Sequence, residues 1–411
     1  MTHAQLGRRE LMAGGAVAAS ALVVASCARG KEADPESQAT SGEKGASVSG
    51  APLADAIVPF DGEHQAGVQT PSQAHINLVG FNLKDGAGQR GARNLMRLWT
   101  EDARALCTAE TPRGSLEPEM TQTPANLTVT CGWGESFFAK IGAQKPEWLG
   151  DVRSYKRDKL RPEWGQTDVV LQICCDDQLT ASHVLRHMVR SGASYADVAW
   201  VQQGFLNANG SLEDGETPRN VFGQKDGTVN PKTDADFVEQ VWIEDGPFKG
   251  GTAMVVRRIN MNMETWEEVD RHAREISIGR TLDNGAPLSG TEENDPVDLE
   301  ARDKYGLKAI DPTSHVARAH PPADHPEQVI LRRPYNFDLA PSPERPGELS
   351  NSGQIFICFQ KNPREQFEPI QARLDEVDQL NTWITHVGSA MYYVVPGTQG
   401  GTSWGENLLK G

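Results

Sequence analysis

Short runs of apolar and β-branched residues alternate along the chain with stretches in which apolar residues recur every three to four positions. The first pattern is typical of buried strands and the second of amphipathic helices. In the first half, the patterns predict strands at 75–81, 127–131 and 169–174, and helices at 92–105 and 181–191. In the second half, they predict strands at 252–259, 354–359 and 391–395, and helices at 264–278 and over most of 367–387.

The two halves share this succession of elements, and each is compatible with a ferredoxin-like α+β unit. Residues 132–138, after a strand of the first half, roughly mirror 360–367 in the second, which points to a degenerate duplication. No Gly-x-Gly-x-x-Gly follows a strand, so a nucleotide-binding doubly wound sheet is not supported. The stretch 281–332 has the composition of a loop, and loops of this length inside a domain are usually functional.

The N-terminus has the composition of a targeting segment. Arg8-Arg9 precedes an apolar, alanine-rich run at 13–25 that is too short for a comfortable membrane span. A twin-arginine export signal is predicted, and an ordinary secretory signal with an incidental arginine pair is the alternative. Small residues before Cys27 resemble a lipobox, so the protein is expected either to be lipidated at Cys27 or to be freely secreted. The next stretch, rich in Gly, Ser, Ala, Glu and Lys, predicts a flexible tether.

Composition narrows the range of partners. The chain of 411 residues is long enough for two domains, and its net charge of -16 argues against nucleic acid, whose phosphates would be repelled. The same charge disfavours adsorption to anionic lipid, so membrane contact is expected only through an N-terminal lipid. Beyond Cys27 five cysteines remain, an odd number that argues against a full disulfide framework, and their spacing is not that of a zinc site. Buried free thiols are expected for the four that lie in strand-like apolar runs, Cys131, Cys174, Cys175 and Cys358.

Three polar residues are candidates for a catalytic or cofactor-binding site. Asp226 lies in a glycine-flanked turn, His315 follows Ser314, and Arg332 belongs to an apolar run at 329–333. An acid, an imidazole and a guanidinium can serve a haem peroxidase as proton shuttle, iron ligand and charge stabiliser. Taken singly, each has a plainer interpretation. Asp-Gly most often only makes a turn, and histidines in a loop are mostly surface residues.

Gly-x-x-Asp-Gly at 223–227 resembles the signature of the dye-decolourising peroxidases. The resemblance extends through similar segments in the same order, at 59–67, 172–177, 250–259, 278–280, 285–288, 314–321 and 386–390. It is strongest to the exported, twin-arginine-signalled branch that includes deferrochelatase-type proteins. The resemblance implies an α+β fold in which duplicated ferredoxin-like units form a β-sheet core with peripheral helices, similar to a dimeric α/β barrel. It also implies one haem b, held largely by the second unit.

The predicted organisation combines both lines of reasoning. It comprises an export signal with a candidate lipobox at 1–27, a flexible linker at 28–55, an N-terminal ferredoxin-like unit at 56–218 and a C-terminal haem-binding unit at 219–411.

The resemblance also assigns roles to individual residues. His315 matches the axial iron ligand, Asp226 the acid–base residue and Arg332 the arginine that stabilises bound peroxide. Gly223 and Gly227 are expected, with His315 and Arg332, to contact the cofactor. Arg333 is the rival of Arg332, but neighbouring residues of an extended chain point in opposite directions, so only one of them can face the haem.

The partner of the second imidazole nitrogen is expected to be a carboxylate. Asp378 falls at the margin of the apolar face of the predicted helix at 367–387, whereas Asp375 is expected to point closer to solvent. Hydrogen bonding from His315 to Asp378 would make the imidazole more basic. A solvated helix carboxylate is the alternative for Asp378.

These residues predict an exported haem b peroxidase. Hydrogen peroxide would oxidise dyes, phenols or similar bulky reductants in one-electron steps through a ferryl intermediate. Some of the nine Trp and six Tyr are expected near the surface, where they could relay electrons. One alternative is a haem-handling, deferrochelatase-type protein of iron acquisition. Another is a surface lipoprotein with a vestigial pocket, which intact Asp226, His315 and Arg332 disfavour.

Overall fold

The computed structural model describes residues 52–341 and 349–410. The predicted export signal, Cys27 and almost all of the predicted linker lie outside the described residues.

The elements of the first half are β1 (His75–Leu83), α1 (Gly88–Cys107), β2 (Thr128–Trp133), α2 (Glu135–Ile141), β3 (Val169–Cys175), α3 (Gln178–Gly192) and β4 (Ala196–Phe205). Those of the second half are α4 (Asp234–Gln240), β5 (Thr252–Met261), α5 (Met263–Glu267), α6 (Arg271–Ile278), α7 (His315–Ala319), β6 (Leu331–Arg332), β7 (Tyr335–Leu339), β8 (Asn351–Gln360), α8 (Phe367–Val377), β9 (Ile384–Val394) and α9 (Glu406–Leu409).

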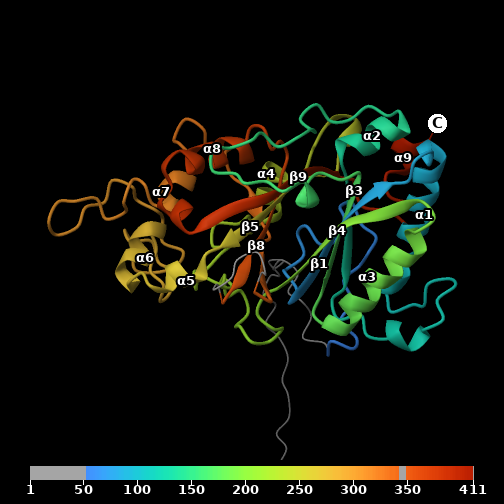
Figure 1. Ribbon diagram of the computed structural model, residues 1–411, viewed down its shortest axis with the longest axis horizontal. Coiled ribbons are helices and arrows are strands. Elements are labelled where there is room, and N and C mark those ends of the chain that lie inside the picture. The colour runs from blue at the N-terminus through green and yellow to red at the C-terminus, as the bar shows by residue number, and fades with distance from the viewer. Residues whose placement is uncertain (1–51, 342–348, 411) are drawn as a thin grey trace, which may run out of the picture. The chain divides into compact units, whose positions relative to one another are not determined.

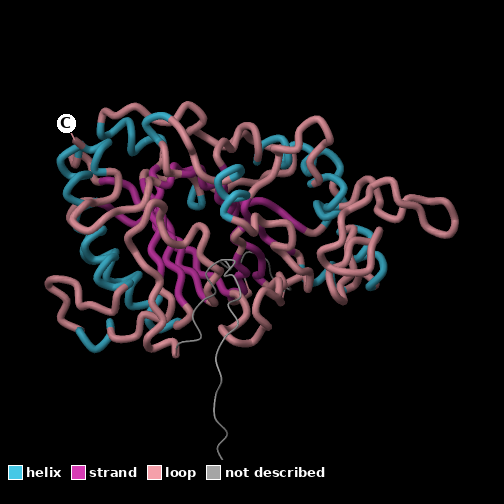
Figure 2. Tube along the Cα trace, turned by 180° about the vertical axis from the view of Figure 1, so that it is seen from behind, coloured by secondary structure: helices cyan, strands magenta, loops and turns pink. Residues whose placement is uncertain are grey.

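The strands of both halves form one antiparallel sheet that closes on itself. The order in the first half is β4-β1-β3-β2, and in the second half it is β9-β5-β8-β7, with the short β6 also beside β8. Each half therefore places its fourth, first, third and second strand side by side. The halves join where β2 pairs with β9 and β4 pairs with β7. The predicted α+β fold of two ferredoxin-like units is confirmed, with helices around the sheet (Figures 1 and 2).

Both faces of the central strands are buried, which explains their continuous apolar runs. Leu171 and Ile173 of β3 face a core formed with α1 and α3, where Trp99 is fully buried. Val170 and Cys174 point the other way, into a second core enclosed by the sheet. Successive side chains of such a strand alternate between two buried faces, so most of them are apolar, and a buried polar one such as Gln172 is hydrogen-bonded.

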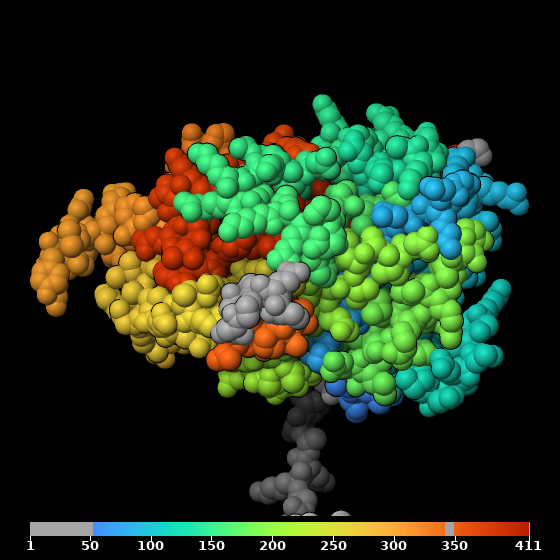
Figure 3. All heavy atoms as spheres, in the orientation of Figure 1, coloured from blue at the N-terminus to red at the C-terminus, as the bar shows by residue number. Residues whose placement is uncertain are grey.

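The outer face of the sheet in the second half is covered by helices that leave a cavity, unlike that in the first half. The helices α5, α6, α7 and α8 gather at this end of the molecule, opposite α1, α2 and α3 (Figure 1). Where α1 and α3 fill the space over the first half with side chains, a cavity remains between α6, α7, α8 and the strands β5, β8 and β9. The connection between α6 and α7 is mostly loop, as predicted for 281–332, and part of it projects from the surface (orange in Figure 3).

Two predicted helices differ from the structure. The helix predicted at 264–278 is interrupted, because the side chain of Asp270 accepts a hydrogen bond from the main-chain N–H of Ala273 and starts α6. The helix predicted over most of 367–387 ends at Val377. Asp378 has an extended conformation (φ -62°, ψ 127°) and caps the short 3₁₀ turn that follows. The chain from Ile384 is strand β9, of which the strand predicted at 391–395 is only the end.

The patterns also missed β4, β6 and β7. These strands carry polar or exposed positions, so apolar alternation identifies them poorly. The prediction for the cysteines is confirmed within the described residues, where Cys107, Cys131, Cys174, Cys175 and Cys358 are buried and unpaired. No helix in the described ranges is long and apolar enough to cross a membrane.

Candidate active site

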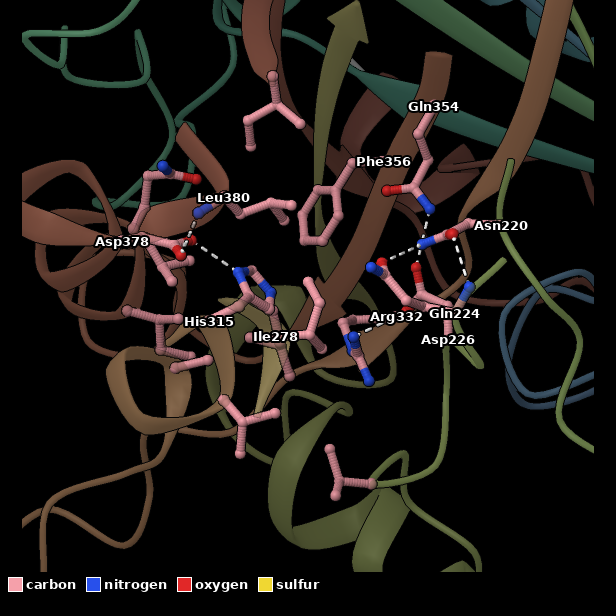
Figure 4. Close-up of a pocket in the computed structure, with 18 of the residues that line it drawn as sticks. Asn220, Gln224, Asp226, Ile278, His315, Arg332, Gln354, Phe356, Asp378 and Leu380 are labelled. Carbon is pink, nitrogen blue, oxygen red and sulfur yellow. Dashed lines mark hydrogen bonds and ion pairs between the residues drawn. The ribbon is translucent and has the colours of Figure 1, made fainter. Parts of the chain in front are cut away.

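The cavity of the second half has a volume of about 390 Å³. Its walls are largely apolar, with Ile259 and Met261 from β5, Phe356 from β8 and Leu374 from α8. The polar groups converge from opposite sides. His315 and Asp378 lie at one side of this space, and Asp226 and Arg332 at the other (Figure 4). An apolar cavity with a few convergent polar groups is the usual form of a small-molecule site.

His315 is the first residue of α7, whose start is set by Ser314. The hydroxyl of Ser314 accepts a hydrogen bond from the main-chain N–H of Ala317. Nδ1 of His315 lies 2.7 Å from Oδ2 of Asp378, whose side chain is 1% exposed. The other carboxylate oxygen of Asp378 accepts from the main-chain N–H of Leu380. This bonding fixes the imidazole ring and leaves Nε2 on the far side from Asp378, available to a ligand in the cavity (Figure 4).

Two other histidines line the same cavity, His320 and His386. Nδ1 of His386 is 4.0 Å from the nearest carboxylate, Asp158, which is too far for a hydrogen bond. Burial, followed by the charge of Arg257, lowers the pKa of His386 well below its usual value. Burial also acts to lower the pKa of His315, but the charge and hydrogen bond of Asp378 outweigh it, and the net shift is upward.

Asp375 is closer to solvent than Asp378, as expected, but the difference is small, at 9% against 3% exposed. Asp375 is buried, and its carboxylate accepts hydrogen bonds from the main-chain N–H groups of Lys156 and Arg157. It therefore fastens α8 to a loop of the first half. Asp378 reaches His315 as the residue that ends α8, not as a residue on the apolar face of a longer helix.

Asp226 and Arg332 contact each other directly. Nη1 of Arg332 donates to Oδ1 of Asp226 over 2.7 Å, and Nε2 of Gln354 donates to Oδ2 over 2.8 Å. The backbone of Arg332 is fixed by Asn230, whose side chain accepts from its N–H and donates to its carbonyl. Both oxygens of Asp226 are thus oriented by donors from β6 and β8 (Figure 4).

Arg333 points away from the cavity, opposite to Arg332. Its side chain is buried and donates to the carbonyl of Thr70 and to Oε1 of Gln73. The alternation of an extended chain therefore separates the two arginines as predicted, with Arg332 at the cavity.

The two glycines that were expected to contact the cofactor do not line this cavity. Gly223 has a φ of 85° and Gly227 a φ of 130°, a conformation that L side chains rarely adopt. Their positions in the structure are explained by the turn that carries Asp226. Gly227 borders a neighbouring pocket, which shares Asp226, Thr228 and Arg332 with the cavity.

Sequence reasoning missed several polar residues of the site, among them Gln224, Asn230, Arg280 and Gln354. Gln354 precedes Phe356 on the same face of β8, and a polar side chain at a buried strand position is the signal that could have indicated it. Arg280 donates to the main-chain carbonyls of Gly285 and Glu293. Burial, and then the charge of Arg332, lower its pKa.

These residues fit the expected haem. Nε2 of His315 is a suitable iron ligand, and the largely apolar walls suit a macrocycle. The guanidinium groups of Arg280 and Arg332 could neutralise the carboxylates of a haem or the charge of an anionic ligand.

Comparison with known proteins agrees with this geometry. The family profiles described as Dyp-type peroxidase, N-terminal and C-terminal, match residues 65–206 and 217–399. The chain is 33% identical over 371 residues to a dye-decolorizing peroxidase of Thermobifida fusca, and the aligned region covers 84% of each chain. It is 32% identical over 380 residues to the deferrochelatase of Escherichia coli K12, covering 86% of this chain and 87% of that relative. The crystal structure of a DyP-type peroxidase from Cellulomonas bogoriensis is similar with a TM-score of 0.84 and 42% identity, over 88% of this chain and 100% of that chain. With both profiles covering most of the sequence, the chain belongs to the Dyp-type peroxidase family.

Proposed function

We propose that this protein is an exported haem b peroxidase that uses hydrogen peroxide to oxidise dyes, phenols or similarly bulky reductants. The observation that carries the proposal is the arrangement of His315–Asp378 on one side of the cavity and Asp226–Arg332 on the other. When bound, the haem would supply the redox-active iron at which peroxide is reduced and the reductant is oxidised.

Each polar residue has a defined part in this proposal. His315 would hold the iron through Nε2, while Asp378 keeps the proton on Nδ1 and orients the ring. Asp226 moves a proton between the two oxygens of hydrogen peroxide, taking it from one and giving it to the other as the O–O bond breaks. The positive charge of Arg332 stabilises the negative charge that develops on the departing oxygen.

Purified protein loaded with haem tests this function. Hydrogen peroxide should be consumed in step with the oxidation of a phenol or a dye, and Asp226→Asn should lose most of this activity while keeping the haem. Asn makes an equally good turn residue, so a variant with unchanged activity would remove Asp226 from the mechanism.

A deferrochelatase-type role is the alternative, favoured by the relatives of that name in Escherichia coli and Shigella. In that role the pocket would hold haem as cargo, and iron would leave while the macrocycle stays whole. Fluorescence of metal-free porphyrin distinguishes the two functions. Its appearance after incubation of the haem-loaded protein with a reductant and an iron chelator, without peroxide turnover, would favour iron release.

A row of aromatic side chains supports the oxidation of reductants that are too large for the cavity. Phe222 lines the cavity and stacks on Trp266 with ring centroids 4.4 Å apart. The ring of the half-buried Trp383 lies 5.1 Å from that of Trp266. Closely spaced aromatic rings offer a path for electrons between the surface and the cavity.

Trp383→Phe is therefore expected to lower kcat/KM for a bulky dye and to leave kcat/KM for a small phenol unchanged. Trp164→Phe is the matched control, because Trp164 is also half-buried but does not line the cavity wall or contact this row. Steady-state kinetics with both substrates measures the effect. Equal losses with the dye and the phenol would contradict a surface path.

Asp378→Asn should keep an acceptor oxygen for Nδ1 of His315 but remove the negative charge, with the amide N–H₂ group in place of the oxygen that accepts from Leu380. A neutral acceptor makes the imidazole a weaker donor to iron, so the iron reduction potential should rise and peroxidase activity should fall by about 10- to 100-fold. Asp375→Asn is the control, since the carboxylate of Asp375 accepts from the main-chain N–H groups of Lys156 and Arg157 and does not contact His315. Spectroelectrochemical titration of the three proteins gives the potentials, and identical values would refute the role of Asp378.

Export is part of the proposal and is supported by Arg8-Arg9 ahead of the apolar run. Lysines in place of both arginines should retain the protein in the cytoplasm, because twin-arginine transport requires the pair. Cys27→Ser should convert a lipid-anchored protein into a released one. Cell fractionation reports both results, and unchanged export of the lysine variant would favour the ordinary secretory route.

A further inference from the structure

Gln224 carries a polar group that the proposed mechanism leaves unused. Its side chain lines the cavity and is 8% exposed. Within the described chain, its Nε2 is buried and has no hydrogen-bond partner. A buried donor without an acceptor lowers the stability of a protein. The unpaired N–H₂ group of Gln224 therefore suggests a ligand that accepts a hydrogen bond from it.

The orientation of this amide is set by Asn220. Oδ1 of Asn220 accepts from the main-chain N–H groups of Phe222 and Gln224, at 3.0 and 3.2 Å. The other end of the Asn220 amide must then be its donor, Nδ2, which lies 3.4 Å from Oε1 of Gln224. Gln224 therefore turns its oxygen to Asn220 and is left with Nε2 toward the cavity (Figure 4).

Two neighbouring donor groups are already engaged, although Arg332 keeps further N–H groups for a ligand. Arg332 and Gln354 both donate to Asp226, from opposite sides of its carboxylate. On this side of the cavity, the carboxylate of Asp226 can accept a hydrogen bond from a ligand. The neutral N–H₂ group of Gln224 can donate one to the ligand without breaking an existing hydrogen bond.

We propose that Gln224 donates a hydrogen bond to the oxygen substrate, or to an anion in its place, on the side of the cavity formed by Asp226 and Arg332. This inference rests on the proposed function for the position of the substrate. The amide cannot take a proton from peroxide at neutral pH, so it holds the oxygen without competing with Asp226 for the proton.

Fluoride tests this contact, because it binds ferric haem and accepts hydrogen bonds but undergoes no redox reaction. In the haem-loaded protein at fixed pH, Gln224→Leu should weaken fluoride binding by about 10-fold, the order expected for the loss of a hydrogen bond to a charged group. The charge-transfer band of the fluoride complex should shift at the same time. Asn220→Asp should have a similar effect, because the new carboxylate attracts Nε2 of Gln224 and turns its oxygen to the cavity.

The melting temperature separates this role from a structural one. Gln224→Leu should change the melting temperature of the protein without haem little, since the lost N–H₂ group has no partner there and the lost acceptor takes only a long hydrogen bond of 3.4 Å from Asn220. A fall in both melting temperature and fluoride affinity would assign Gln224 to the scaffold and overturn the inference.

Arg332→Leu separates the inference from the proposed function. If Arg332→Leu weakens fluoride binding and Gln224→Leu does not, only the role of Gln224 is refuted. If neither variant changes fluoride binding, the substrate does not lie on the side of the cavity formed by Asp226 and Arg332, and the proposed roles of these two residues are refuted as well.

Discussion

Replacing Arg332 with leucine is expected to slow the reaction of the haem-loaded protein with hydrogen peroxide by about 10²–10³-fold, the usual loss when one preorganised charge-stabilising donor is removed. Arg332 is the cation that contacts Asp226 at the cavity, and its backbone is fixed on both sides by Asn230. Stopped-flow mixing with peroxide under pseudo-first-order conditions gives the bimolecular rate constant.

Arg333→Leu is the matched control for this prediction. Because Arg333 donates to Thr70 and Gln73 and lies outside the cavity, its loss leaves buried acceptors unpaired. The free energy of unfolding should fall by about 1–3 kcal/mol, while the folded protein keeps its rate with peroxide. Equal losses of rate in both variants would contradict the separate roles of the two arginines.

Replacing His315 with alanine is expected to remove most of the haem from the purified protein. Nε2 of His315 is the candidate iron ligand that a buried carboxylate orients, and the alternatives His320 and His386 have no such partner within hydrogen-bond distance. The ratio of Soret to protein absorbance after gel filtration measures haem content.

His320→Ala controls for general damage to the cavity and should retain the haem. Free imidazole added to His315→Ala should restore part of the Soret absorbance, because the substitution leaves room next to Asp378 for an exogenous ligand. Full haem content in His315→Ala, with an unchanged Soret band, would assign the iron to another residue.

Local patterns predicted the parts of the site that depend on neighbouring residues. The Asp226 turn requires positive φ at Gly223 and Gly227, which glycine adopts at little cost. Arg332 and Arg333 point in opposite directions because side chains alternate along an extended chain. These features follow from the covalent geometry of short segments, and the structure contains them.

The sequence also indicated buried strands in the core, because runs such as Val169–Cys175 are apolar apart from Gln172. Only the tertiary structure decided how the halves join, since the pairings of β2 with β9 and of β4 with β7 link strands that are far apart in the chain. It also decided that α8 ends at Val377, because the side chain of Asp378 accepts a hydrogen bond from the N–H of Leu380, and this bond competes with continuation of the helix.

The side-chain contacts between distant segments also depend on tertiary packing. Examples are the contacts of Asp375 with residues 156 and 157, and of Gln354 with Asp226. No local periodicity encodes such contacts, because they form only when the closed sheet brings those segments together.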